Sequence, residues 1–217
     1  MTAAFFDVDG TLTRTNVLVP LAWFQRAHLP SWRYGIWLAG LMVQAPLYWL
    51  ADRIDRTLFV RWFYRRYKGI PAASARQWHA QHFGDMLLQA LRPAAFACVQ
   101  THRAQGHRIV LVTGNLDFVV APLAELLGAD FLAVALEERD GVFTGRLASP
   151  PMVGAAKATA LREYAQRHGI VLATSYAYGD SISDAPMLMC VGNPVAVNPD
   201  PKLRRLAQQR GWRIVTW

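Results

Sequence analysis

The sequence predicts an α/β protein in which helices cover a parallel sheet and an all-helical segment follows the first strand. Short apolar, β-branched runs alternate with helix-like stretches near the N-terminus and again from His107 onward. Residues 16–91 contain no such run, and their apolar residues recur at helical spacing. Alternating strands and helices are typical of a parallel sheet with both faces covered.

The individual elements follow from these patterns. After the first strand near Phe5, we expect strands at residues 108–112, 131–134, 175–178, 194–197 and 212–215. Helices are expected between them at residues 116–127, 154–168 and 201–209. The pattern breaks at residues 138–145, where Asp140-Gly141 is a hairpin signal and predicts a small β-flap.

The segment from Asn16 to Leu91 is predicted to form a separate helical cap. Helical periodicity runs through residues 17–27, 32–50, 54–67 and 72–91. We therefore predict a core of residues 1–15 and 92–217 with a cap of residues 16–91. The cap holds six of the eight tryptophans: Trp23, Trp32, Trp37, Trp49, Trp62 and Trp78.

Composition narrows the class of protein. The chain has 217 residues, is 53% hydrophobic and 18% charged, and has a net charge of +8, which describes a globular protein able to bury a core. The cations are scattered except in the run Arg61–Lys68, so a nucleic-acid partner is not predicted. That run is either a solvated helix face, which is the commoner case, or an amphipathic basic helix for contact with a membrane or nucleic acid.

Targeting signals and cysteines favour the cytoplasm. A strand begins within five residues of Met1, which leaves no room for a signal peptide, and residues 36–51 are too short for a spanning helix. Cys98 and Cys190 lie in apolar contexts without metal or redox spacing, as expected of core residues in a reducing compartment.

The segment Phe5–Thr13 places two carboxylates at the end of the first strand. Asp7 and Asp9 lie two positions apart on an extended chain, so their side chains leave the same face. Gly10 then permits a sharp turn. Such a pair suits a carboxylate nucleophile beside an acid/base with Mg²⁺ between them, although Asp-Gly is also a common turn signal.

Three further polar sites follow predicted strands or open helices. Thr113-Gly114-Asn115 offers a hydroxyl and backbone N–H groups for an anion, or a routine helix cap. Lys157 is one of three lysines and lies early in a helix, where a surface lysine is the plainer explanation. Asp180 and Asp184 supply oxygen ligands for a hard cation, or cap a helix. Loops at the carboxyl ends of parallel strands converge, which predicts one shared pocket.

Taken together, these motifs resemble the haloacid dehalogenase superfamily of phosphohydrolases. DxDGT at Asp7–Thr11, Thr113, Lys157 and GDSxxD at Gly179–Asp184 occur in the order of that superfamily over essentially the whole chain. The helical insertion after the first motif is similar to the cap of the phosphoserine-phosphatase-like branch.

The resemblance implies a Rossmann-like core and a role for each motif residue. Asp7 would be the nucleophile and Asp9 the general acid/base. Thr113, Gly114, Asn115 and Lys157 would bind the phosphoryl group. Asp7, the Asp9 carbonyl and Asp180 would hold Mg²⁺, with Asp184 near the metal. We therefore expect a cytoplasmic, Mg²⁺-dependent phosphatase of a small phosphorylated metabolite.

Substrate and oligomeric state stay open at this stage. Phosphoserine phosphatases carry a glutamate nine residues after the nucleophile, where this chain has Asn16, so phosphoserine is disfavoured. Histidinol phosphate or another amino alcohol phosphate remains a candidate. The cap tryptophans either stack on a leaving group or pack the cap. Two alternatives are a lipid-phosphate phosphatase at a membrane surface and a non-catalytic protein that binds a phosphorylated ligand.

Overall fold

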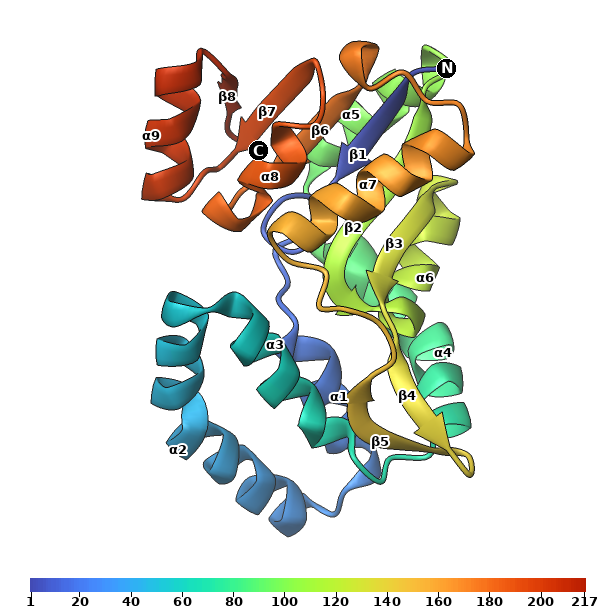
Figure 1. The fold of residues 1–217 in the computed structure, drawn as a ribbon. Helices are drawn as coiled ribbons and strands as arrows, with labels where there is room; N and C mark the ends of the chain where they lie inside the picture. The colour runs from blue at the N-terminus through green and yellow to red at the C-terminus, as the bar shows by residue number, and fades with distance from the viewer.

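The computed structural model describes the backbone of residues 1–217 and all side chains except those of residues 52–54, 83, 85, 87 and 88. Six parallel strands form one sheet in the order β3-β2-β1-β6-β7-β8 (Figure 1). Their bounds are β1 Ala3–Phe6, β2 Arg108–Leu116, β3 Asp130–Val134, β6 Tyr176–Gly179, β7 Asn193–Val197 and β8 Arg213–Val215. The predicted α/β class is confirmed.

Strand β1 lies at the centre of the sheet because both of its faces are apolar. Ala3 and Phe5 point to one buried cluster, while Ala4 and Phe6 point to the other, as the two-residue period of a strand requires. The first cluster is covered by α7 (Ala155–Arg167), α8 (Ala185–Leu188) and α9 (Pro201–Arg210). The second is covered by α5 (Pro93–Ala104) and α6 (Asp117–Leu127).

The helical insertion after β1 lies beyond the carboxyl ends of the strands (Figure 1). It contains α1 (Leu18–His28), α2 (Ser31–Ile54), α3 (Arg56–Tyr64), the 3₁₀ turn η1 (Arg65–Tyr67) and α4 (Ala72–Ala90). Helix α4 also packs along the core helix α6. The division into core and cap at the stated residues stays a prediction.

Three local predictions need correction. Strand β2 continues to Leu116, so Thr113-Gly114-Asn115 end a strand and do not open a helix. The expected helix over residues 54–67 begins only at Arg56, because the Asp55 side chain accepts a hydrogen bond from Thr57 N at 2.8 Å and caps it, and its last turn, η1, is 3₁₀. Helix α5 was not predicted.

The expected hairpin is present. Strands β4 (Leu136–Arg139) and β5 (Val142–Leu147) pair antiparallel across Asp140 (φ 50°) and Gly141 (φ 77°), the left-handed pair that a tight hairpin turn needs. It packs on α3 and η1, and it contributes no residue to the cavity described below. Two further 3₁₀ turns, η2 (Leu172–Thr174) and η3 (Ile182–Asp184), flank β6.

The described part of the chain contains no helix whose length and apolar character would let it cross a lipid bilayer.

Candidate active site

The site lies where the strand order reverses. From β1 the chain moves outward through β2 and β3 and then returns to β6 on the other side of β1, so a crevice opens beyond the ends of β1 and β6. Asp7 follows β1, and its backbone N–H donates to Tyr178 O in β6 at 2.9 Å. Asp180 follows β6 directly. The topology therefore brings the two acidic motifs together.

A buried lysine joins two of the acidic residues. Lys157 Nζ donates to Asp7 Oδ1 at 2.5 Å and to Asp184 Oδ1 at 2.7 Å. All three side chains are buried, with residue exposures of 4% for Lys157, 5% for Asp7 and 2% for Asp184. A buried ammonium is tolerated only with partners of this kind. The surface-lysine interpretation of Lys157 is therefore wrong.

The electrostatics of this group leave an excess of negative charge. Burial raises the pKa of Asp7 to about 8; the Lys157 charge opposes that shift, while Asp184 and Asp180 add to it. Burial alone would lower the pKa of Lys157, but the charges of Asp184 and Asp7 outweigh it and raise that pKa above its ordinary value. One ammonium does not balance three clustered carboxylates, so a cation would relieve their repulsion.

A carboxylate cluster provides the ligands for such a cation. One oxygen each from Asp7, Asp180 and Asp184 lies within 4.8 Å of the others. Burial raises the pKa of Asp180 to about 6, with a further contribution from the Asp184 charge. An all-oxygen donor set of this kind fits a hard divalent ion such as Mg²⁺.

Gly10 makes this geometry feasible. It has φ +87°, and a Cβ at this position would lie 2.2 Å from Asp180 Oδ2. Thr11 Oγ1 donates to Asp180 Oδ1 at 3.4 Å, which ties the turn after β1 to the loop after β6. Only glycine allows both the left-handed backbone and this close approach.

Asp9 is held apart from the cluster. Its Oδ1 accepts from Thr15 Oγ1 at 3.1 Å, and its Oδ2 accepts from Asn115 Nδ2 at 3.3 Å. Burial raises the pKa of Asp9, against these two hydrogen bonds, which lower it. A fixed carboxyl group with a raised pKa is suited to proton transfer.

The other predicted phosphate ligands occupy the end of β2. Thr113 is fully buried, and its Oγ1 accepts from Asn115 N at 3.0 Å. Gly114 lines the cavity, and its carbonyl accepts from Tyr64 Oη at 2.8 Å. The structure thus brings the end of β2 to Asp9 and to the cavity that the Asp cluster lines. The role of each residue in binding phosphate stays a prediction.

Sequence reasoning missed the contacts that the helical insertion makes. Arg56, the first residue of α3, donates from Nη1 to Ser181 Oγ at 3.2 Å and to Ser183 Oγ at 3.3 Å. Its charge also favours the ionised forms of Asp9 and Asp180. A lone arginine at a helix start carries no local signal of this role. Thr15 could have been found, since it lies only four residues after the DxDGT motif.

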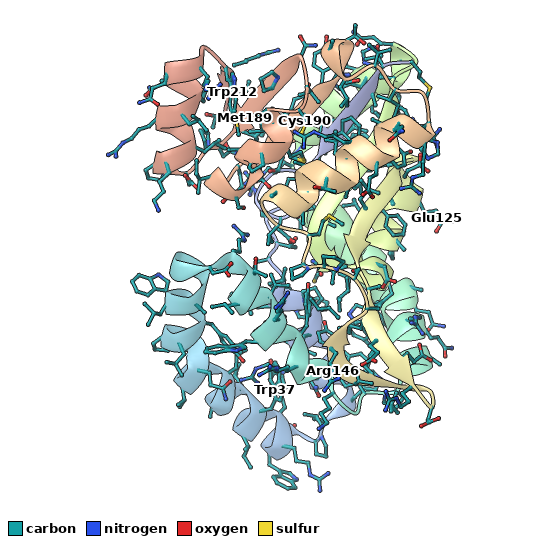
Figure 2. The ribbon with its side chains drawn as sticks, in the orientation of Figure 1. Trp37, Glu125, Arg146, Met189, Cys190 and Trp212 are labelled. Carbon is teal, nitrogen blue, oxygen red and sulfur yellow. The ribbon has the colours of Figure 1, made fainter. Side chains whose placement is uncertain are left out.

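A cavity of about 410 Å³ lies between the strand ends and the helices α1–α3. This volume is typical of small-molecule sites. Its lining combines Asp7, Asp180 and Asp184 of the core with residues of all three helices, and Figure 2 shows side chains, among them Trp37 of α2, in the space between α2 and α3. The acidic cluster therefore opens into a space bounded by both parts of the molecule.

Comparison with known proteins agrees with this geometry. Residues 4–189 match the family model of haloacid dehalogenase-like hydrolases. The chain is 43% identical over 216 residues to a putative hydrolase of Mycobacterium leprae, covering 98% of this chain and 71% of that protein. It is 33% identical over 222 residues to phosphoserine phosphatase SerB1 of Mycobacterium tuberculosis, covering 98% and 70%.

A solved structure extends the likeness to the whole fold. The Bordetella pertussis Tohama I protein of unknown function superposes with a TM-score of 0.81 at 29% identity, covering 99% of both chains. The chain belongs to the haloacid dehalogenase-like hydrolases. Within them it is a phosphatase of the phosphoserine-phosphatase-like branch, with its helical segment inserted after the first strand.

Proposed function

We propose that the protein is a Mg²⁺-dependent phosphomonoesterase that acts on a small phosphorylated metabolite through an aspartyl-phosphate. The observation that carries the proposal is the buried Asp7 carboxylate, which Lys157 Nζ contacts at 2.5 Å beside Asp180 and Asp184. Phosphoryl transfer depends mainly on positioning and on positive charge against the phosphoryl oxygens. A site that only bound phosphate would have no need of a nucleophile.

The first step forms the covalent intermediate. A carboxylate oxygen of Asp7 attacks phosphorus, and the bond from phosphorus to the leaving oxygen breaks. Asp9 gives its proton to that oxygen, so the leaving group departs as an alcohol. Thr15 and Asn115 hold the Asp9 carboxyl group during this transfer.

The second step releases phosphate. Asp9, now ionised, takes a proton from water as the water oxygen attacks the aspartyl-phosphate. The bond from phosphorus to the Asp7 oxygen breaks, which returns the Asp7 carboxylate and yields inorganic phosphate. One water is consumed for each ester, and Asp9 ends in its starting protonation state.

The remaining polar residues bind and orient. Lys157, Thr113, Gly114 and Asn115 are assigned to the phosphoryl oxygens. Mg²⁺ would be held by Asp7, Asp180 and the Asp9 carbonyl oxygen, with Asp184 nearby, and when bound it supplies positive charge to those oxygens. Asn16 lines the cavity and offers no negative charge for an ammonium group, so phosphoserine is disfavoured.

Substitution of the nucleophile tests this function. Asp7→Asn should abolish hydrolysis of p-nitrophenyl phosphate with Mg²⁺, because an amide cannot attack phosphorus at a useful rate. Wild-type enzyme quenched in acid during turnover should carry one phosphoryl group, which the variant lacks.

The exposed turn residue Asp140 provides the matched control. Asp140→Asn makes the same chemical change in a left-handed position that asparagine tolerates, and it should retain full activity. Substantial turnover by purified Asp7→Asn would refute the covalent mechanism.

A further inference from the structure

The cavity has a polar end and an apolar end. At the polar end lie the four acidic residues and Lys157 of the core. At the other end, α1–α3 contribute mainly hydrocarbon and aromatic surface: Leu18, Leu41, Met42, Ala45, Tyr48, Trp49, Phe59 and Val60. The phosphate would lie at the first end, so the leaving group has to extend toward the second.

Two polar groups that the insertion places along the cavity already have partners within the protein. Tyr48 Oη donates to Gln44 Oε1 at 2.9 Å and accepts from Arg66 Nε at 2.9 Å. Asn16 Oδ1 accepts from Leu18 N at 3.0 Å. All four acidic residues of the described lining belong to the core: Asp7, Asp9, Asp180 and Asp184. An ammonium or a polyhydroxyl leaving group would lose its hydration here without a carboxylate partner, whereas a hydrocarbon chain would gain by burial.

The outer face of α2 continues this apolar surface. The helix buries only a narrow stripe that includes Leu41 and Tyr48, while other large apolar side chains remain exposed. Val43 is 79% exposed and Met42 is 66% exposed. The remaining members of this exposed apolar face are Trp32, Ile36, Leu38, Leu47, Trp49 and Leu50. Figure 1 shows α2 on the outside of the insertion, where it packs on α1 and α3.

Two residues connect this face to the cavity. Met42 and Trp49, which is 57% exposed, both line the cavity and reach the surface. The apolar end therefore opens onto the exposed face of α2. Exposed apolar patches of this kind normally mark contact surfaces.

Charge distinguishes between the partners that could cover the face. Residues 16–91 contain nine Lys and Arg residues against three Asp, so the insertion carries +6 of the net +8. A second copy would bring two such charges together, which disfavours self-association. A helix that exposes apolar side chains on a segment carrying +6 is attracted to an anionic bilayer, where those side chains insert at the headgroup boundary.

We propose that the substrate is a single-chain lipid monophosphate, which the protein takes from an anionic membrane surface through α2. The phosphate binds at Asp7, and the acyl or alkyl chain occupies the apolar end of the cavity. This inference rests on the proposed phosphomonoesterase function and chooses for its substrate the lipid phosphate that the sequence left as an alternative. The reaction is the same hydrolysis: water supplies the hydroxyl group to phosphorus and the proton to the leaving oxygen.

The first experiment varies the leaving group. Alkyl phosphates of increasing chain length and p-nitrophenyl phosphate are compared at fixed Mg²⁺. Each added methylene should raise kcat/KM about fourfold until the apolar end is filled. Failure to hydrolyse p-nitrophenyl phosphate would refute the proposed function and this inference with it. Hydrolysis without any dependence on chain length would refute the inference alone.

The second experiment tests the membrane surface with lysophosphatidic acid in phosphatidylcholine vesicles, with and without phosphatidylserine. Wild-type protein should float with the anionic vesicles and hydrolyse the lipid they carry. Val43→Glu should reduce vesicle binding about tenfold, and it should lower lipid turnover relative to p-nitrophenyl phosphate turnover. Val171→Glu makes the same change at a surface position outside the helical insertion, where the side chain is 49% exposed, and this variant should behave as wild type.

Two outcomes would refute the membrane proposal. One is an absence of wild-type binding to anionic vesicles. The other is a change in oligomeric state on Val43→Glu, measured by light scattering, with vesicle binding retained. The latter would assign the apolar face to a second copy of the chain.

Discussion

Lys157 holds the acidic residues of the site in one arrangement. Its ammonium group lies between Asp7 Oδ1 and Asp184 Oδ1, and the three side chains are almost fully buried. Removing either carboxylate would leave a buried charge with one partner fewer, which is strongly unfavourable. The same contact fixes the rotamer of Asp7, so the proposed nucleophile is positioned before substrate arrives.

Asp9 should transfer protons, first to the leaving group and then from water. Asp7, and not Asp9, should attack phosphorus. Asp9→Asn should lower the rate with alkyl phosphates about 10²–10⁴-fold, because the leaving oxygen would depart without its proton. Aryl phosphates should lose less in the first step, since phenolates leave without protonation. Single-turnover phosphorylation with both ester types measures the difference, and an equal loss for the two would contradict the acid role.

At the scale of elements, the turn after β1 depends on one glycine. Gly10→Ala would place a Cβ 2.2 Å from Asp180 Oδ2 and would also strain a backbone with φ +87°. Gly69 provides a matched control, because it has φ +81° and a Cβ added there would meet nothing within 4 Å. Gly69→Ala should cost about 1–2 kcal/mol from backbone strain alone.

Gly10→Ala should lose more stability than Gly69→Ala and should also need more Mg²⁺ for half-maximal activity. Denaturant unfolding and Mg²⁺ titration measure the two effects. If both variants lose the same stability and the Mg²⁺ requirement does not change, the close approach of Gly10 to Asp180 contributes neither to folding stability nor to metal binding.

Helix α4 joins the insertion to the core through a buried histidine. His79 is fully buried, lies among Phe24 of α1, Trp78 and Phe118 of α6, and has its Nδ1 2.7 Å from Ala75 O. Burial lowers its pKa from 6.5 to about 4. The folded state therefore binds this proton less readily than the unfolded state does.

That difference predicts a loss of stability in acid. The contribution of neutral His79 is fully present above pH 6.5 and is lost as the pH falls from 6.5 toward 4, amounting to about 3 kcal/mol. His79→Phe should flatten this part of the profile of unfolding free energy against pH. His82→Phe, an exposed change on the same helix, should not. Parallel profiles for wild type and His79→Phe would contradict the assignment.

At the scale of the whole molecule, the site is assembled from segments far apart in the chain. Asp7 follows β1, Asn115 ends β2, Lys157 lies in α7 and Asp180 follows β6. Arg56 of the insertion then contacts Ser181 and Ser183 of the core across the cavity. Binding of a cation or a substrate in the cavity should therefore stabilise the contact between the core and the helical insertion.

Metal removal tests this assembly. Protein treated with EDTA should lose phosphatase activity and regain it with Mg²⁺, and Mg²⁺ should raise its Tm because only the folded state brings Asp7, Asp180 and Asp184 together. Asp180→Ala should sharply increase the Mg²⁺ requirement or eliminate activity. Full activity in the chelated wild type would refute both the metal assignment and the role of Asp180.

Local sequence patterns were sufficient for the class of fold and the position of the motifs. Period-two alternation and β-branched runs identify strands, helical spacing identifies the insertion, and Asp140-Gly141 identifies the hairpin turn, because each depends on neighbours in the chain. The ends of elements depend on pairing with distant segments. Nothing local to Thr113-Gly114-Asn115 reports that β3 pairs with β2 as far as Leu116.

Tertiary structure decided the environment of each functional group. Lys157 read alone resembles a surface lysine, and it becomes a buried partner of Asp7 only when segments 150 residues apart meet. The contacts of Arg56 and the apolar end of the cavity likewise arise from packing between distant elements. The sequence by itself therefore determined the fold class and the phosphatase motifs. Burial, charge balance and the shape of the leaving-group space came from long-range packing, because they depend on which residues surround a group and not on which ones precede it.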